Sequence, residues 1–198
     1  MKIKICGIKN EAEVKIINET KPDFAGFIFA PSKRFVDFEY AKKICAKVNP
    51  EIKKVGVFVE KTANEILNYK NIVDIIQLHG DYTENDVECL KKEGFEVIKV
   101  IKVKEEIYNI ETKADYLLFD TYSPFVSGGL GKTFNWDIKI KTKTPYFIAG
   151  GINQENIIKM YEKFKPYGAD VSSGAEENGF KTKEKVSCII NTVRRINL

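Results

Sequence analysis

The stretch KIKICGIKNEAEVKIINETKPDFAGFIFA, residues 2–30, contains the unit whose repetition decides the fold. Polar and apolar residues alternate in KIKICGI (2–8), as they do in a strand. The next segment, NEAEVKIINET (10–20), has helical periodicity and begins with an asparagine suited to an N-cap. The apolar run FAGFIFA (24–30) then predicts a second strand. Strand, helix and strand in this order are typical of a parallel βαβ unit.

The same alternation continues to the end of the chain. Strands are predicted at 2–8, 24–30, 53–59, 74–80, 96–103, 115–121, 145–151 and 169–174. Helices are predicted at 10–20, 37–48, 61–69, 83–94, 153–164 and 183–196. Eight units of this kind predict an α/β protein, either an open doubly wound sheet or a (β/α)8 TIM barrel.

Two observations favour the barrel. No GxGxxG motif follows the first strand, so the usual mark of a dinucleotide-binding open sheet is missing. The chemically distinctive residues fall at the carboxyl ends of many strands, which a barrel gathers around one mouth. The length of 198 residues suits one domain, and we expect residues 1–198 to form a single barrel.

Composition indicates a soluble globular protein, with 43% hydrophobic and 30% charged residues and no apolar run of about 20 residues. No secretory signal follows Met1, so we expect a cytoplasmic protein without membrane contact. The net charge of +4 is scattered, which argues against a nucleic-acid partner and suits a small anionic ligand. The pattern does not distinguish a monomer from a homodimer.

The four cysteines are far apart, and the chain has one histidine. This spacing argues against a zinc site and, in a reducing compartment, against disulfides. Cys45, Cys89 and Cys188 lie in predicted helices, where we expect small buried hydrophobes. Cys6 instead ends the first strand, and is a candidate reactive thiol.

Other polar side chains follow further strands. Arg34 lies in the loop PSKRF and suits a carboxylate ligand, with a solvated loop charge as the alternative. His79 is either an acid–base or substrate-binding residue or a hydrogen-bonded structural group; we count it among the substrate-binding candidates. Asp120 follows the apolar run YLLF and suits a general acid, although a turn cap is the alternative.

Two small-residue turns follow the last two strands, Gly150–Gly151 in IAGG and Ser173–Gly174 in VSSG. Backbone N–H groups in such turns, at the start of helical sequence, are typical of a barrel phosphate site. The long glycine-containing segment 122–136 is predicted to approach a ligand or to act as a hinged lid.

The motifs KICGIK, GFIFAPSKRFV, IQLHGD, LFDT, GGLGKTFNW, FIAGGINQENI and GADVSSGAEENGFK resemble, in order, those of the phosphoribosylanthranilate isomerase family of tryptophan biosynthesis. The resemblance runs from Lys2 to about Lys181. It implies a (β/α)8 barrel that needs no cofactor or metal. It also implies an Amadori rearrangement of N-(5-phosphoribosyl)anthranilate to 1-(2-carboxyphenylamino)-1-deoxyribulose 5-phosphate.

The resemblance implies roles for the matched residues. Cys6 corresponds to the general base, Asp120 to the general acid and Arg34 to the residue that holds the anthranilate carboxylate. The turns at Gly150–Gly151 and Ser173–Gly174 correspond to the phosphate site. Asn135 and Thr182 are departures, since the family commonly has aspartate at both positions, and we expect Thr182 to cap the last helix with its hydroxyl.

Strand parity places Lys4 on the same face as Cys6, with Ile3 and Ile5 on the other face. We expect Lys4 to point into the barrel below the thiol, to pair with Asp170 of the last strand, and to tune Cys6.

The alternatives are another phosphosugar isomerase or epimerase barrel, which usually relies on metal ligands or paired aspartates, and a non-catalytic phosphosugar-binding protein.

Overall fold

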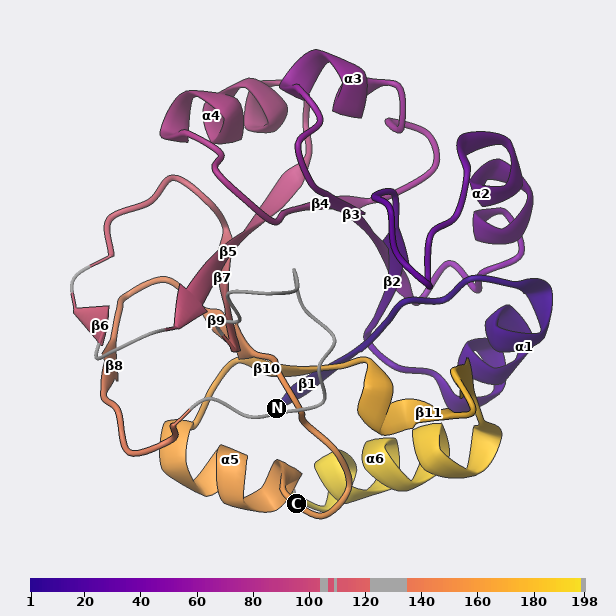
Figure 1. Ribbon diagram of the computed structural model, residues 1–198, viewed down its shortest axis with the longest axis vertical. Helices are drawn as coiled ribbons and strands as arrows, with labels where there is room; N and C mark the ends of the chain where they lie inside the picture. Colours follow the sequence, from indigo (N-terminus) through magenta and orange to yellow (C-terminus); the bar gives the residue numbers. More distant parts are fainter. Residues whose placement is uncertain (104–106, 109, 122–134, 197–198) are drawn as a thin grey trace.

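Eight parallel strands close into a barrel, with helices in a ring around it (Figure 1). The computed structural model describes residues 1–103, 107–108, 110–121 and 135–196. The barrel strands are β1 (Lys2–Cys6), β2 (Phe24–Ile28), β3 (Lys53–Phe58), β4 (Ile75–Leu78), β5 (Glu96–Val103), β7 (Tyr116–Thr121), β9 (Tyr146–Ile148) and β10 (Gly168–Val171). Each strand pairs with its neighbours in chain order, and β10 closes the barrel against β1. The (β/α)8 barrel is confirmed, and the open sheet is excluded.

All six predicted helices are present. They are α1 (Glu11–Thr20), α2 (Phe38–Cys45), α3 (Ala63–Leu67), α4 (Glu84–Lys92), α5 (Ile157–Phe164) and α6 (Lys183–Ile196). Asn10, Asp37, Thr62 and Thr83 begin the first four, and each side chain accepts a hydrogen bond from the backbone N–H three residues later. Such caps satisfy donors that a helix leaves unpaired at its first turn.

Two connections differ from the strand-then-helix repeat. In their described residues, the connections after β5 and β7 contain no helix but the short strands β6 (Ile107–Tyr108) and β8 (Ile140–Lys141), which pair in parallel. Figure 1 shows this pair outside the barrel wall. Isoleucine and tyrosine favour extended backbone, which agrees with the lack of a helical pattern in this part of the sequence. The predicted lid, 122–136, lies outside the described residues except for its last two positions.

The barrel interior is apolar where its strands begin. Phe24, Tyr116, Phe147 and Tyr167 pack there edge to face or tilted, with ring centroids 5.2–5.8 Å apart. Ile3 and Ile5 belong instead to the cluster between the strands and the helices. This aromatic layer fills the barrel below the polar side chains at the carboxyl ends of the strands.

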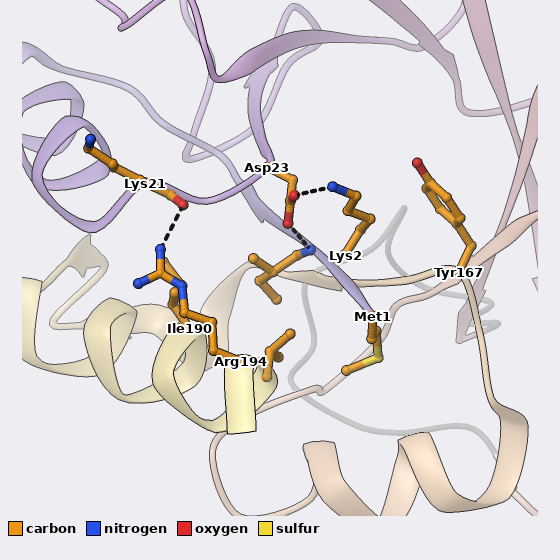
Figure 2. Close-up of a pocket in the computed structure, with 9 residues that line it drawn as sticks. Met1, Lys2, Lys21, Asp23, Tyr167, Ile190 and Arg194 are labelled. Carbon is orange, nitrogen blue, oxygen red and sulfur yellow. Dashed lines mark hydrogen bonds and ion pairs between the residues drawn. The ribbon is translucent and has the colours of Figure 1, made fainter. Parts of the chain in front are cut away.

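A cavity of about 410 Å³ lies at the amino-terminal end of the barrel, between β1 and α6 (Figure 2). Three of its charged residues, Lys2, Asp23 and Arg194, bind one another or the backbone. Asp23 accepts hydrogen bonds from Lys2 Nζ (2.7 Å) and from the Ile3 amide (2.9 Å), and Arg194 donates to the Lys21 carbonyl. These contacts connect α1, β1 and α6, and we assign them to the stability of the fold.

The described helices include no segment with the length and apolar character that a membrane span requires.

Candidate active site

A cavity of about 340 Å³ opens at the carboxyl ends of the barrel strands. Seven of the eight residues predicted for the site line it: Cys6, Arg34, His79, Asp120, Gly150, Gly151 and Ser173. Cys6 and Asp120 lie in β1 and β7, and the others come from the segments that follow β2, β4, β9 and β10. The eighth residue, Gly174, packs in the wall, where a Cβ would overlap the Ile152 carbonyl. The predicted residues therefore meet at one place.

Cys6 lies at the bottom of this cavity next to a buried ion pair. Lys4 points into the barrel, is fully buried, and places Nζ 2.9 Å from Asp170 Oδ1, as parity and barrel closure predicted. A Cβ on Gly26, the register partner of Cys6 on β2, would lie 2.8 Å from Cys6 Sγ and 3.0 Å from Lys4 Nζ. The thiol and the ammonium therefore face the same side-chain-free position.

Burial and charge act in opposite directions on this thiol. Burial raises the pKa of Cys6, the positive charge of Lys4 lowers it, and the carboxylate of Asp170 raises it, so that the pKa lies above its usual value. The thiol is therefore mostly protonated at neutral pH, and Lys4 supplies the main interaction that favours the thiolate.

Asp120 lies in β7, across the cavity mouth from Cys6. In the closed strand order, β10 and β9 separate its strand from β1. Asp120 is half-buried and lines the same cavity as the thiol. A substrate between β1 and β7 would therefore contact a thiol on one side and a carboxyl group on the other.

His79 and Gln77 come from β4 and its end, and point to the same face. Both are buried and line the cavity, and Gln77 Oε1 and His79 Nε2 have no hydrogen-bond partner among the described residues. Burial, with the charges of Lys102 and Lys4, lowers the pKa of His79 to about 4, so the imidazole is neutral. Gln77 was not predicted; its place two residues before His79 in DIIQLHG was the available signal.

The two small-residue turns border the cavity after β9 and β10. Gly150 and Gly151 have φ values of 81° and 65°, a left-handed backbone that other residues rarely adopt. After β10 the backbone enters the short 3₁₀ helix η1 (Ser173–Ala175), and the Ser172 hydroxyl donates to the Cys6 carbonyl (3.0 Å). The turn after β10 is thus joined directly to the strand that carries the thiol.

Arg34 also lines the cavity, but it is not an unpaired arginine. Its Nε and Nη2 donate to Glu176 Oε1 and Oε2 at 2.6 and 2.8 Å, and Lys181 Nζ donates to Glu176 Oε1 at 2.7 Å. Glu176 belongs to β11 (Glu176–Glu177) and Lys181 to β12 (Phe180–Lys181), a small hairpin beyond β10. Sequence reasoning missed Glu176, which binds Arg34, and Lys181, which binds the same carboxylate.

Comparison with known proteins identifies the family. Residues 3–192 match the family described as N-(5'-phosphoribosyl)anthranilate (PRA) isomerase. The chain belongs to the PRA isomerase family. The isomerase of Endomicrobium trichonymphae is 44% identical over 196 residues, covering 98% of this chain and 96% of that protein. The isomerase of Clostridium acetobutylicum is 40% identical, covering 98% of each.

Solved PRA isomerases have the same fold. The Thermus thermophilus structure superimposes with a TM-score of 0.88 at 27% identity, covering 99% of this chain and 100% of that one. A second was solved in complex with reduced 1-(o-carboxyphenylamino)-1-deoxyribulose 5-phosphate, and has a TM-score of 0.80 at 25% identity, with coverage of 98% and 99%. A third consists of monomers generated from the dimeric Thermotoga maritima protein, with a TM-score of 0.79 at 26% identity, covering 98% of this chain and 99% of that one.

Neither of the two departures from the common PRA isomerase pattern is among the described residues that line the cavity. Asn135 Oδ1 accepts a hydrogen bond from the Asp137 amide (2.9 Å), and Thr182 Oγ1 accepts one from the Lys185 amide (3.4 Å). Each side chain keeps an acceptor oxygen in place of the carboxylate, and Thr182 caps α6 as predicted.

Proposed function

We propose that this chain catalyses the Amadori rearrangement of N-(5-phosphoribosyl)anthranilate to 1-(2-carboxyphenylamino)-1-deoxyribulose 5-phosphate, the isomerase step of tryptophan biosynthesis. The observation that supports it most is the shared cavity of Cys6 and Asp120, bordered by the two small-residue turns. Membership of the family, and the product analogue bound in a related structure, support the same reaction.

In the proposed mechanism, Asp120 begins as a carboxylic acid and donates its proton to the ribose ring oxygen. The C1–O bond breaks as the nitrogen lone pair forms an iminium. The Cys6 thiolate then removes the proton from C2, and the electron pair of that C–H bond neutralises the iminium as an enolamine. Tautomerisation of the enolamine gives the ketone. No electrons enter or leave, so the sequence needs no redox cofactor.

The remaining residues would hold the substrate. The turns at Gly150–Gly151 and Ser173–Gly174 would bind the phosphate through backbone N–H groups. Arg34 would bind the ring carboxylate, and the unpartnered atoms of Gln77 and His79 would contact sugar hydroxyls. The four free cysteines suit a reducing compartment, and we propose that the enzyme acts in the cytoplasm.

Loss of substrate fluorescence during turnover tests this function. We expect Cys6→Ala and Asp120→Asn each to lower kcat by at least about 100-fold while substrate still binds. Cys45→Ala is the matched control, because Cys45 is a buried cysteine in α2, remote from the cavity, and should leave kcat unchanged.

We expect a chelator to have no effect on the rate. Chelator-sensitive turnover, or near-normal activity of Cys6→Ala, would contradict the mechanism. Binding without any turnover by the wild-type chain would instead favour the non-catalytic phosphosugar-binding alternative.

A further inference from the structure

Three buried charges form a chain behind one wall of the cavity. The Arg34 and Glu176 side chains are each 7% exposed, and Lys181 is fully buried. Two cations on one carboxylate bring the pKa of Glu176 to about 2: burial raises it, and hydrogen bonds from Arg34 and Lys181 outweigh that effect. Glu176 is therefore ionised at any working pH.

Glu176 binds one particular edge of the guanidinium. Arginine has five N–H donors in a planar fork, and Glu176 accepts from Nε and Nη2, the side-on edge. Of the three remaining donors, one on Nη1 and one on Nη2 form the end-on edge, which has a similar spacing. That edge can bind a second carboxylate in a bidentate manner, and Arg34 is the member of the chain that lines the cavity.

The Glu176 carboxylate is itself held rigidly. Lys181 Nζ donates both to Glu176 Oε1 and to the Ser172 carbonyl (3.1 Å) at the end of β10, and Lys185 Nζ donates to the Glu176 carbonyl (2.7 Å). Gly7 leaves room for the Arg34 side chain, because a Cβ there would overlap Arg34 Cδ. Glu176 thus fixes one edge of the guanidinium, and the missing side chain of Gly7 makes room for the stem of Arg34.

We propose that Glu176 is a positioning residue that aims the end-on edge of Arg34 into the cavity and so selects substrates with a carboxylate on the aromatic ring. This inference rests on the proposed function, which supplies the carboxylate. A positioning role and a simple neutralising role for Glu176 predict opposite effects of its removal on carboxylate binding. If Glu176 only offset the charge of Arg34, its removal would strengthen binding of a second carboxylate.

Binding of two product analogues separates these roles. The first is reduced 1-(o-carboxyphenylamino)-1-deoxyribulose 5-phosphate, and the second is the same molecule without the ring carboxylate. Calorimetry would give both Kd values for the wild type, Glu176→Gln, Glu176→Asp and the control Glu177→Gln. Glu177 follows on the same short strand but is exposed.

We expect Glu176→Gln to raise the Kd of the carboxylate-bearing analogue about tenfold or more. The Kd of the other analogue should rise less than about twofold. Glu176→Asp should give a smaller change of the same sign, and Glu177→Gln none. Equal weakening of both analogues would show a merely structural role and overturn the proposal. A preference that is unchanged or increased in Glu176→Gln would also overturn it.

Folding and function are controlled separately. Thermal unfolding of each variant shows whether it is folded. If Glu176→Gln does not fold, the comparison is made with Glu176→Asp, which keeps the charge balance. Turnover of phosphoribosylanthranilate by the wild type tests the proposed function independently. Absent turnover with retained carboxylate preference would refute the reaction, while the ratio of Kd values still decides the role of Glu176.

Discussion

Lys4 and Asp170 are register partners on β1 and β10 and form a 2.9 Å ion pair inside the barrel, two residues before Cys6 on the same strand face. A fully buried ammonium is tolerated because a carboxylate compensates it. The pair also places a positive and a negative charge near the proposed base, with opposite effects on its pKa.

Substitutions in this ion pair should move the pH profile of the enzyme in opposite directions. The pKa of Cys6 is raised by burial, so kcat/KM should increase with pH as the thiolate forms. Lys4→Met removes the cation, raises the pKa of the thiol further and shifts this increase to higher pH. Asp170→Asn removes the carboxylate and shifts it to lower pH. Shifts of the same sign, in variants shown to be folded by circular dichroism, would contradict a tuning role for Lys4.

A methyl group at position 26 should damage activity more than stability. In Gly26→Ala the new Cβ would lie 2.8 Å from Cys6 Sγ and displace the thiol, at a cost in unfolding free energy of about 1–3 kcal/mol. Gly56→Ala is the matched control, because its Cβ would lie 2.8 Å from the Phe58 ring in the core.

Urea denaturation and kcat should be measured for both glycine variants. We expect similar losses of stability, with a large fall in kcat for Gly26→Ala alone. Equal kcat values in the two variants would show that the thiol tolerates displacement.

The single histidine should make stability depend on pH in a narrow window. His79 has a pKa of about 4 in the folded protein and an ordinary value of 6.5, so below the latter the unfolded chain binds a proton that the folded chain does not. The contribution of the neutral His79 to the free energy of unfolding is therefore fully present above about pH 6.5 and declines as the pH falls toward about 4. Between about pH 7 and about pH 5 the free energy of unfolding should fall by about 2 kcal/mol.

Nuclear magnetic resonance can follow the imidazole directly, because the chain has one histidine. Urea denaturation at the two pH values should show a smaller difference in His79→Asn than in the wild type. An imidazole that titrates near its ordinary value would refute the prediction. The stabilisation from the Glu176 carboxylate, whose pKa is about 2, is fully present above its ordinary value of 4.5 and is lost only at lower pH, below the two pH values compared here.

Replacing Gln77 should separate stability from activity. Its Oε1 atom is buried without a partner among the described residues, which costs folding free energy. Gln77→Met keeps the side-chain volume and should leave stability unchanged or raise it by about 1 kcal/mol, while it raises KM at least about fivefold. Chemical denaturation and steady-state kinetics check the two parts. A destabilised variant with normal KM would show that the amide serves the fold and not the substrate.

Local patterns were enough to predict the barrel and most of its mouth. The period of two in KIKIC separates Ile3 and Ile5 from Lys4 and Cys6, and parallel strands place their carboxyl ends together. Cys6, His79 and Asp120 could therefore be assigned to one cavity by position alone. The Lys4–Asp170 pair required one further step, the closure of the last strand on the first.

Only the tertiary structure decided what each of these groups contacts. Glu176 lies 142 residues from Arg34 in sequence. Nothing local in PSKRF predicts that Nε and Nη2 of Arg34 already bind a carboxylate. The unpartnered oxygen of Gln77 likewise depends on what the other strands leave opposite it. The physical reason is that backbone periodicity and capping arise within a few residues, whereas hydrogen-bond partners and desolvation depend on distant segments that meet only when the barrel closes.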